Sequence, residues 1–117
     1  MAKWDFKDIM PAPTIGWDEY QEWANTTAIY PKDLGLTYTA LGLVNEAGEY
    51  AGKIKKYMRD NTLDDITAAK ELGDVLWYLA VAASELGYDL SEIAQMNIDK
   101  LKSRKERGVI GGSGDDR

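Results

Sequence analysis

The sequence contains no cysteine and no histidine, and these two absences exclude several kinds of functional site. Without cysteine there is no disulfide, no thiolate zinc site and no cysteine nucleophile. Without histidine there is no Ser-His-Asp triad, no HExxH zinc site and no Glu-x-x-His di-iron bundle. A metal ion bound to this chain must therefore be held by oxygen atoms, which favours Mg²⁺ or Mn²⁺ over Ca²⁺.

Long apolar runs and an excess of basic charge are also missing. No apolar stretch approaches the roughly 18 residues of a transmembrane helix, so no membrane segment is expected. Residues 1–5 lack the apolar core of a signal peptide, and the cytoplasm is the expected location. The chain has 14 basic and 20 acidic residues, a formal net charge of −6, so no nucleic-acid polymer is expected as a partner.

What remains is the pattern of a small helical domain. The chain has 117 residues, of which 44% are hydrophobic and 29% charged, as in a single folded domain. Apolar residues recur at steps of three and four, which predicts helices over about 17–29, 37–59, 63–86 and 90–107. We expect an all-α, antiparallel four-helix bundle, with one domain over 1–107 that includes an irregular arm (1–16), and a glycine-rich tail (108–117).

Short local signals mark the ends of these helices. They are an N-cap at Thr14, a capping box Thr62–Asp65, a C-terminal glycine at Gly87 and a capping box Asp89–Glu92. In the capping boxes a side chain at the helix start accepts a hydrogen bond from a backbone N–H group that has no partner within the helix.

Two apolar stripes are expected to form the bundle core. The stripe of the second helix consists of Leu41, Val44, Ala47, Ala51, Ile54 and Met58. The stripe of the third consists of Ile66, Ala69, Leu72, Leu76, Leu79, Ala83 and Leu86. Four tryptophans and seven tyrosines are more than one small core easily encloses, so some are expected at a subunit interface.

Two pairs of acidic residues are the most informative feature. Glu46 and Glu49 stand three apart on the second expected helix, and Glu71 and Asp74 do so on the third. Residues at this spacing share a helix face, so neighbouring helices can bring the four carboxylates together. Packed carboxylates repel one another, and a divalent cation removes that repulsion. The alternative is that each pair belongs to an ordinary solvated face.

Basic and amide residues extend this pattern. Lys53 follows Glu49 by one helical turn, where it can bind phosphate or simply pair with Glu49. On the fourth expected helix Asn97, Lys100 and Arg104 lie along one stripe. Such a stripe suits phosphate oxygens, although a solvated basic face near a helix C-terminus has the same pattern.

Together these motifs resemble the MazG-like nucleoside triphosphate pyrophosphohydrolases of the all-α NTP pyrophosphatase superfamily. The family pattern is ExxE, a spacer, then ExxD. Here it reads Glu46-Ala47-Gly48-Glu49, 21 residues, then Glu71-Leu72-Gly73-Asp74, and residues 97–104 are similar to the later Asn-x-x-Lys-Leu-x-x-Arg element. The resemblance covers about 17–107. One departure is Asn45, where many members carry a further acid.

The resemblance implies hydrolysis of a (deoxy)nucleoside triphosphate to the monophosphate and pyrophosphate. It implies that Glu46, Glu49, Glu71 and Asp74 are catalytic residues that bind Mg²⁺, with Mn²⁺ as a substitute. Substrate would be bound by Lys53, Asn97, Lys100 and Arg104, and the base would stack on an aromatic residue from Trp17, Trp23, Tyr38, Trp77 and Tyr78. It also implies a homodimer or homotetramer.

Two other functions stay open at this point. One is a phosphoribosyl-ATP or dUTP pyrophosphatase of the same superfamily, which would use the same acids. The other is a non-catalytic helical interaction module, which would tolerate the loss of Glu49 or Asp74.

Overall fold

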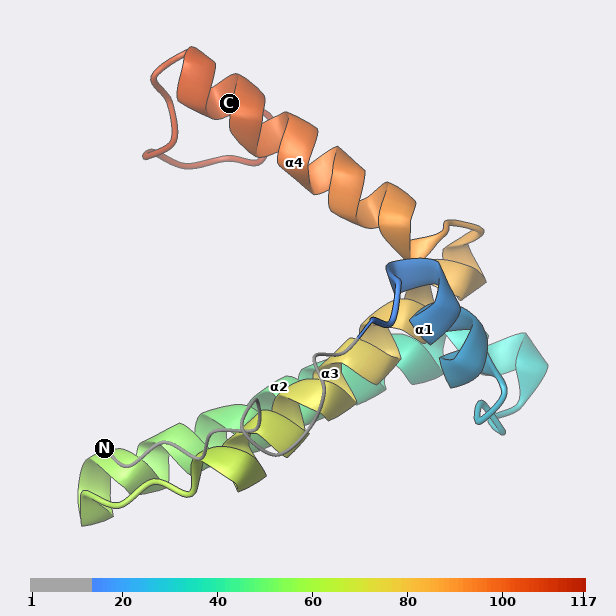
Figure 1. The fold of residues 1–117 in the computed structure, drawn as a ribbon, viewed down its shortest axis with the longest axis vertical. Coiled ribbons are helices and arrows are strands. Elements are labelled where there is room, and N and C mark those ends of the chain that lie inside the picture. Colours follow the sequence, from blue (N-terminus) through green and yellow to red (C-terminus); the bar gives the residue numbers. More distant parts are fainter. Residues whose placement is uncertain (1–13) are drawn as a thin grey trace.

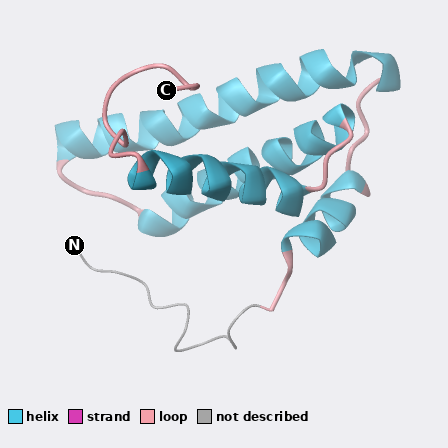
Figure 2. Cartoon of the chain, turned by 90° about the horizontal axis from the view of Figure 1, so that it is seen from above, coloured by secondary structure: helices cyan, strands magenta, loops and turns pink. Residues whose placement is uncertain are grey.

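The structure, a computed structural model, describes residues 14–117, which fold into four α-helices and one short 3₁₀ helix (Figure 1). The elements are α1 (Trp17–Asn25), η2 (Lys32–Leu34), α2 (Gly35–Asp60), α3 (Asp65–Leu86) and α4 (Leu90–Glu106). The described residues contain no strand (Figure 2), so the expected all-α class is confirmed. No described helix is both long and apolar enough to cross a bilayer.

Two of the four predicted helix-end signals are confirmed. Gly87 ends α3 in the left-handed conformation, with φ of 83°, where a side chain would be strained. Asp89 and Glu92 form the capping box of α4, and the Glu92 side chain accepts a hydrogen bond from the Asp89 N–H at 2.9 Å. These signals depend only on neighbouring residues, which is why the sequence reveals them.

The other two predicted caps are wrong. Gly16, rather than Thr14, precedes α1, and it offers no side-chain cap. Asp64, rather than Thr62, caps α3, because its carboxylate accepts hydrogen bonds from both the backbone N–H and the hydroxyl of Thr67. A carboxylate that receives two such bonds is the better cap at this turn.

Helix α1 also ends four residues earlier than predicted, at Asn25. The hydroxyls of Thr26 and Thr27 donate hydrogen bonds to the carbonyls of Trp23 and Ala24, at 2.6 and 2.8 Å. These hydroxyls bond to carbonyl oxygens that would otherwise accept hydrogen bonds from backbone N–H groups of a further helical turn, so they favour ending the helix here.

Helices α2 and α3 are joined by a short turn and run antiparallel side by side (Figure 1). Two glycines of α2 allow this close approach. A Cβ atom at Gly42 would lie inside the contact distance of the Tyr78 ring, and one at Gly35 would overlap the Glu85 carboxylate. The side chain of Glu85 in turn accepts a hydrogen bond from the Tyr30 hydroxyl.

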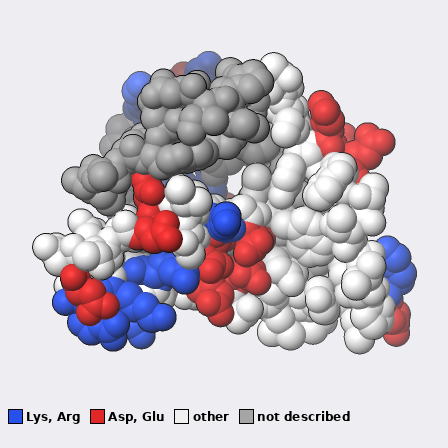
Figure 3. Space-filling model, turned by 60° about the horizontal axis from the view of Figure 1, so that its bottom comes forward, with Lys and Arg blue, Asp and Glu red and all other residues white. Residues whose placement is uncertain are grey.

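Most residues of the predicted apolar stripes do not face the interior of the chain, although Ala83 on α3 is buried. On α2, Leu41, Val44 and Met58 are 67%, 73% and 81% exposed, and on α3 Leu72 and Leu86 are 49% and 61% exposed. Figure 3 shows a broad area on one face that carries neither acidic nor basic side chains. The expectation that these stripes form the core is wrong within one chain, because the α2–α3 contact uses the glycine, tyrosine and acidic face instead.

The buried core is small and lies where α1 meets α3 and the start of α4. It consists of Ala24, Tyr30, Ala80, Val81 and Leu90. Burial of such side chains contributes about 25 cal/mol per Å² of apolar surface. This end of the molecule therefore fixes how α1 sits on α3.

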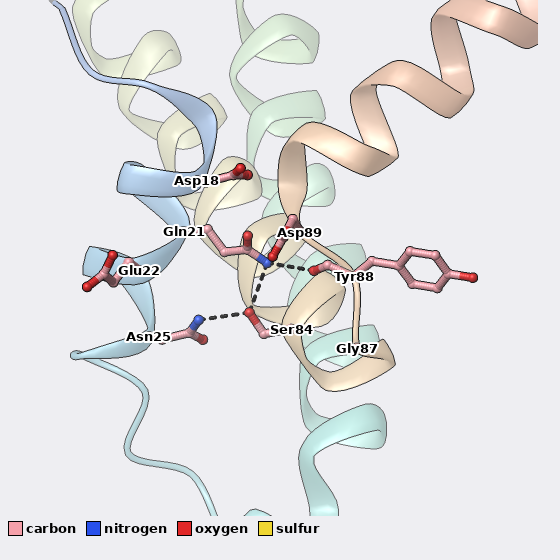
Figure 4. Close-up of a pocket in the computed structure, with 8 residues that line it drawn as sticks. All are labelled: Asp18, Gln21, Glu22, Asn25, Ser84, Gly87, Tyr88 and Asp89. Carbon is pink, nitrogen blue, oxygen red and sulfur yellow. Dashed lines mark hydrogen bonds between the residues drawn. The ribbon is translucent and has the colours of Figure 1, made fainter.

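A buried glutamine joins the three helices at that core (Figure 4). The Gln21 side-chain NH₂ group lies within hydrogen-bond distance of three acceptors, the Ala80 carbonyl, the Ser84 hydroxyl and the Tyr88 carbonyl, which share its two hydrogens. Its oxygen accepts a hydrogen bond from the Leu90 N–H. Every polar atom of the side chain is thus paired, which offsets the cost of burying it.

Helix α4 points away from the α2–α3 pair (Figure 1). It contacts α1 and α3 near its start but not α2. The radius of gyration is 17.1 Å, whereas a compact domain of this length has about 13 Å. The helices of a single chain therefore do not form the closed four-helix bundle that the sequence predicts.

The two glycines Gly42 and Gly48 make a matched test of the α2–α3 contact. Gly42→Ala should lower the free energy of unfolding by about 1–3 kcal/mol, because the new Cβ displaces the Tyr78 ring. Gly48→Ala meets nothing within 4 Å and should raise it by up to about 1 kcal/mol through helix propensity. Urea unfolding followed by circular dichroism measures both, and equal effects would contradict the described packing.

Candidate metal site

Three of the predicted acids converge between α2 and α3. Glu46 on α2 and Glu71 and Asp74 on α3 each offer one carboxylate oxygen, and these oxygens all lie within 4.8 Å of one another. Glu46 and Glu71 are half-buried and Asp74 is exposed. The antiparallel pairing thus brings together residues that are 25 to 28 positions apart in the sequence.

The fourth predicted acid, Glu49, is not part of this group. It is exposed, one turn further along α2 than Glu46. It is still close enough for its charge to raise the pKa of Glu46. Its role as a fourth ligand stays a prediction.

No basic side chain neutralises this group in the described part of the chain. The ion pairs found in residues 14–117 are Arg59–Asp60, Lys100–Asp115 and Arg104–Asp115, and none of them involves Glu46, Glu71 or Asp74. Three carboxylates held within 4.8 Å without a cation repel one another.

The repulsion is visible in the pKa of Glu46. Desolvation raises this pKa above its ordinary value of 4.5, and the charges of Asp74, Glu71 and Glu49 raise it further. The same charges act on nearby phenols. Burial and then Tyr38, Glu46 and Asp74 raise the pKa of Tyr78. A cation at this position would relieve the electrostatic part of each shift.

The group fits a divalent cation in both chemistry and spacing. Mg²⁺ prefers octahedral carboxylate and water oxygens at about 2.0–2.1 Å, so its ligand oxygens lie about 2.9–4.2 Å apart. The 4.8 Å spread of the three oxygens lies close to that range. The residues that could hold the ion are Glu46, Glu71 and Asp74.

A cavity of about 360 Å³ opens beside the carboxylates and is lined by Thr27, Glu46, Asp74, Trp77 and Tyr78. Thr27 belongs to the segment after α1, and its hydroxyl accepts a hydrogen bond from the Trp77 indole N–H at 2.8 Å. The rings of Trp77 and Tyr78 meet edge to face at 4.9 Å between centroids. The cavity thus combines an acidic wall with an aromatic wall.

The other predicted aromatic residues lie outside this cavity lining. Trp17 and Trp23 are more than half exposed on α1. Tyr38 stacks on Tyr30 with 4.8 Å between the ring centroids, and its ring lies 6.2 Å from that of Tyr78. Two of the five aromatic candidates, Trp77 and Tyr78, therefore line the cavity itself.

Lys53 lies apart from the carboxylate cavity. It lines a smaller cavity of about 200 Å³ at the turn between α2 and α3, together with Lys56, Asp64 and Thr67. The alternative ion pair with Glu49 is not present among the described ion pairs.

The residues predicted on α4 do not reach the group of Glu46, Glu71 and Asp74 in their own chain, because α4 makes no contact with α2. Asn97 is exposed. Lys100 and Arg104 both bind the carboxylate of Asp115 in the tail, at 2.8 and 3.2 Å. The stripe on α4 therefore already holds an anionic group.

Two residues in these contacts were missed by the sequence analysis. Thr27 accepts a hydrogen bond from Trp77, which lies 50 residues later in the sequence, and Asp115 accepts one from Lys100, which lies 15 residues earlier. Neither contact follows from helical spacing, since each joins a helix to an irregular segment. The only sequence feature that pointed to Asp115 as a contact residue is that it is an acidic residue in the glycine-rich tail.

Comparisons with known proteins indicate the family of the chain. A family model described as the MazG nucleotide pyrophosphohydrolase domain matches residues 35–109, which include all four predicted acids. A curated relative, the Gene 37 protein of Mycobacterium phage L5, is 50% identical over 113 residues, covering 86% of this chain and 97% of that protein. Its name states no activity. No solved structure matches significantly.

Magnesium should stabilise the fold in a pH-dependent way. Because folding raises the pKa of Glu46, the metal-free chain loses stability as the pH rises through that pKa. Bound Mg²⁺ reverses this, so saturating Mg²⁺ should raise Tm by about 4 °C or more at pH 7.5 and by little at pH 4.5. Differential scanning fluorimetry measures the shift.

Two variants distinguish Mg²⁺ binding at the carboxylate group from a general effect of salt on Tm. Asp74→Asn should lose most of the Mg²⁺-induced shift, while Glu106→Gln at the exposed end of α4 should keep it. An equal shift in both variants would show that Mg²⁺ acts elsewhere.

Proposed function

The chain belongs to the family of the MazG nucleotide pyrophosphohydrolase domain, and from this premise we propose that it hydrolyses (deoxy)nucleoside triphosphates to the monophosphate and pyrophosphate. The observation that carries the proposal is the convergence of Glu46, Glu71 and Asp74 with no basic partner among residues 14–117. The proposed location is the cytoplasm, where such a substrate is found.

The proposed cofactor is Mg²⁺, with Mn²⁺ as a substitute, held by Glu46, Glu71 and Asp74 with Glu49 beside them. When bound, such an ion neutralises charge on the triphosphate and lowers the pKa of a water molecule. This explains why an acidic site suits an anionic substrate. The carboxylates alone would repel it.

The proposed reaction is an in-line displacement by water. The water oxygen bonds to the α-phosphorus, the bond from that phosphorus to the oxygen bridging to the β-phosphate breaks, and pyrophosphate leaves. The proton of the water passes to a carboxylate. Glu49 suits this role because it is exposed and lies outside the three-residue group, so its oxygens are not committed to a shared ion.

We propose that the base stacks in the aromatic half of the cavity, on Trp77 or Tyr78. The edge-to-face contact between these rings and the hydrogen bond to Thr27 hold the indole in one orientation, which limits the entropy lost on binding. The cavity volume of about 360 Å³ is near the lower end for a small-molecule site, about 300–1,000 Å³.

A homodimer or homotetramer would complete the site. The outward apolar residues of α2 and α3 and the exposed Ile98 and Leu101 of α4 give a large surface for a second copy. In such an assembly α4 of one copy could supply Asn97, Lys100 and Arg104 to the carboxylates of another. Lys53, at the turn between α2 and α3, is kept as a further phosphate ligand.

Two other functions predict different results. A phosphoribosyl-ATP or dUTP pyrophosphatase would leave the same pyrophosphate but act on one substrate of a panel. A non-catalytic helical interaction module would show no turnover and would tolerate changes at Glu49 and Asp74. The uncompensated acidic group favours the catalytic proposals, because carboxylates without a metal destabilise the fold that brings them together.

The products decide the proposed cleavage. With Mg²⁺ and a panel of NTPs and dNTPs, the chain should release pyrophosphate and a nucleoside monophosphate, resolved from orthophosphate by ion chromatography. Asp74→Ala should reduce turnover by about 100-fold or more while circular dichroism stays unchanged. Release of orthophosphate alone would reject attack at the α-phosphorus.

The assembly is tested separately. Light scattering after size exclusion should give a mass at least twice 13.1 kDa. Val44→Glu places a charge on the outward face of α2 and should shift the protein toward monomer. Thr62→Glu adds the same charge at the turn after α2 and should leave the mass unchanged. A wild-type monomer at micromolar concentration would contradict the assembly.

A further inference from the structure

The last residues of the chain form a closed loop on α4. The Arg117 guanidinium donates hydrogen bonds to the carbonyls of Val109, Ile110, Gly111 and Gly114. All of these partners lie within the loop itself, so the ring holds its own shape. Figure 2 shows this loop turning back from the end of the chain's last helix.

Asp115 fastens the loop to α4. Its carboxylate accepts hydrogen bonds from Lys100 at 2.8 Å and from Arg104 at 3.2 Å, and its backbone carbonyl accepts another from Arg104. The bonds from Lys100 and Arg104 lower the pKa of Asp115. The carboxylate is therefore charged at neutral pH and occupies a pair of cations.

Arg104 is not fully satisfied by this arrangement. Its side chain is only 7% exposed, and its buried Nε atom has no hydrogen-bond partner among the described residues. A guanidinium offers five N–H donors in a planar fork, and a phosphate offers more acceptor oxygens to that fork than one aspartate does. The orphan donor indicates a site built for a larger oxyanion than the one it holds.

We propose that residues 108–117 form an autoinhibitory latch, in which Asp115 occupies the Lys100–Arg104 pair until the phosphate groups of a nucleotide displace it. The proposal rests on the proposed function in that the displacing anion is the triphosphate of the substrate. It adds a regulatory step to that function. The tail sets the affinity of the phosphate-binding stripe on α4 and takes no part in the cleavage itself.

The structure provides what such a latch needs. The Asp115 side chain is 77% exposed, so a competing anion can approach its contacts from solvent, and its ion pair with the partly exposed Lys100 is weak. Glycines at 108, 112 and 114 adopt positive φ angles of 71°, 101° and 90°. Gly108 stands at the junction with α4, where a backbone rotation would swing the whole ring. Opening also breaks the bond from Arg107 to the Arg117 carbonyl oxygen and, with rotation at Gly108, the bond from the Val109 N–H to the Arg104 carbonyl.

The test is a titration of the full chain with inorganic tripolyphosphate in EDTA, followed by isothermal calorimetry. Asp115→Asn should bind at least about fivefold tighter than wild type, because the closed state no longer competes. Asp116→Asn, which removes the neighbouring exposed carboxylate, should bind like wild type. Adding Lys100→Ala to the Asp115→Asn variant should abolish the gain.

A second variant is expected to open the latch by straining the backbone of the loop rather than by removing the Asp115 charge. Gly114→Ala is strained at φ of 90°, so it should open the loop and tighten binding in the same direction. For nucleotide hydrolysis, Asp115→Asn should lower KM by a similar factor and leave kcat within about twofold.

An unchanged or weaker affinity for tripolyphosphate in Asp115→Asn would overturn the latch. The weaker result would mean instead that Asp115 positions Lys100 and Arg104 for binding. Because the titration needs no turnover, a failure of the proposed cleavage would appear only in the product analysis, and the two outcomes stay distinguishable.

Discussion

The mutual repulsion of Glu46, Glu71 and Asp74 is the constraint on which the rest of the molecule depends. The antiparallel pairing of α2 and α3 holds their oxygens within 4.8 Å, and no basic residue of the described chain pairs with them. Packing next to the acids, through Gly42 against Tyr78, and at the start of α2, through Gly35 against Glu85, keeps the two helices too close for the acids to separate freely. The fold therefore concentrates negative charge at this position, and the proposed divalent cation would neutralise it.

The same helix pairing explains why so much apolar surface faces outward. A helix has a limited number of faces, and α2 and α3 use their glycine, tyrosine and acidic faces against each other. Their leucine and valine stripes are then left for another copy, and α4 extends without touching α2. The candidate metal site and the proposed oligomer would thus both follow from the helix faces that α2 and α3 use against each other.

The sequence predicted much of the fold but not how the helices pack. The all-α class, the Gly87 end of α3 and the Asp89–Glu92 cap follow from periodicity and local hydrogen bonding, so they could be read directly. Spacing also indicated that Glu46, Glu71 and Asp74 could meet. It did not reveal which face of each helix is buried, because an apolar stripe serves a core and a subunit interface equally well. The contacts of Thr27 and Asp115 join irregular segments to helices, and no periodic rule covers them.

Anomalous diffraction from crystals of the protein grown with Mn²⁺ tests whether the three carboxylates hold a metal ion. An anomalous peak is expected within about 2.5 Å of carboxylate oxygens from Glu46, Glu71 and Asp74. This expectation would be contradicted by crystals in which these three side chains turn apart into solvent, with no ion bridging them in any assembly of the chain.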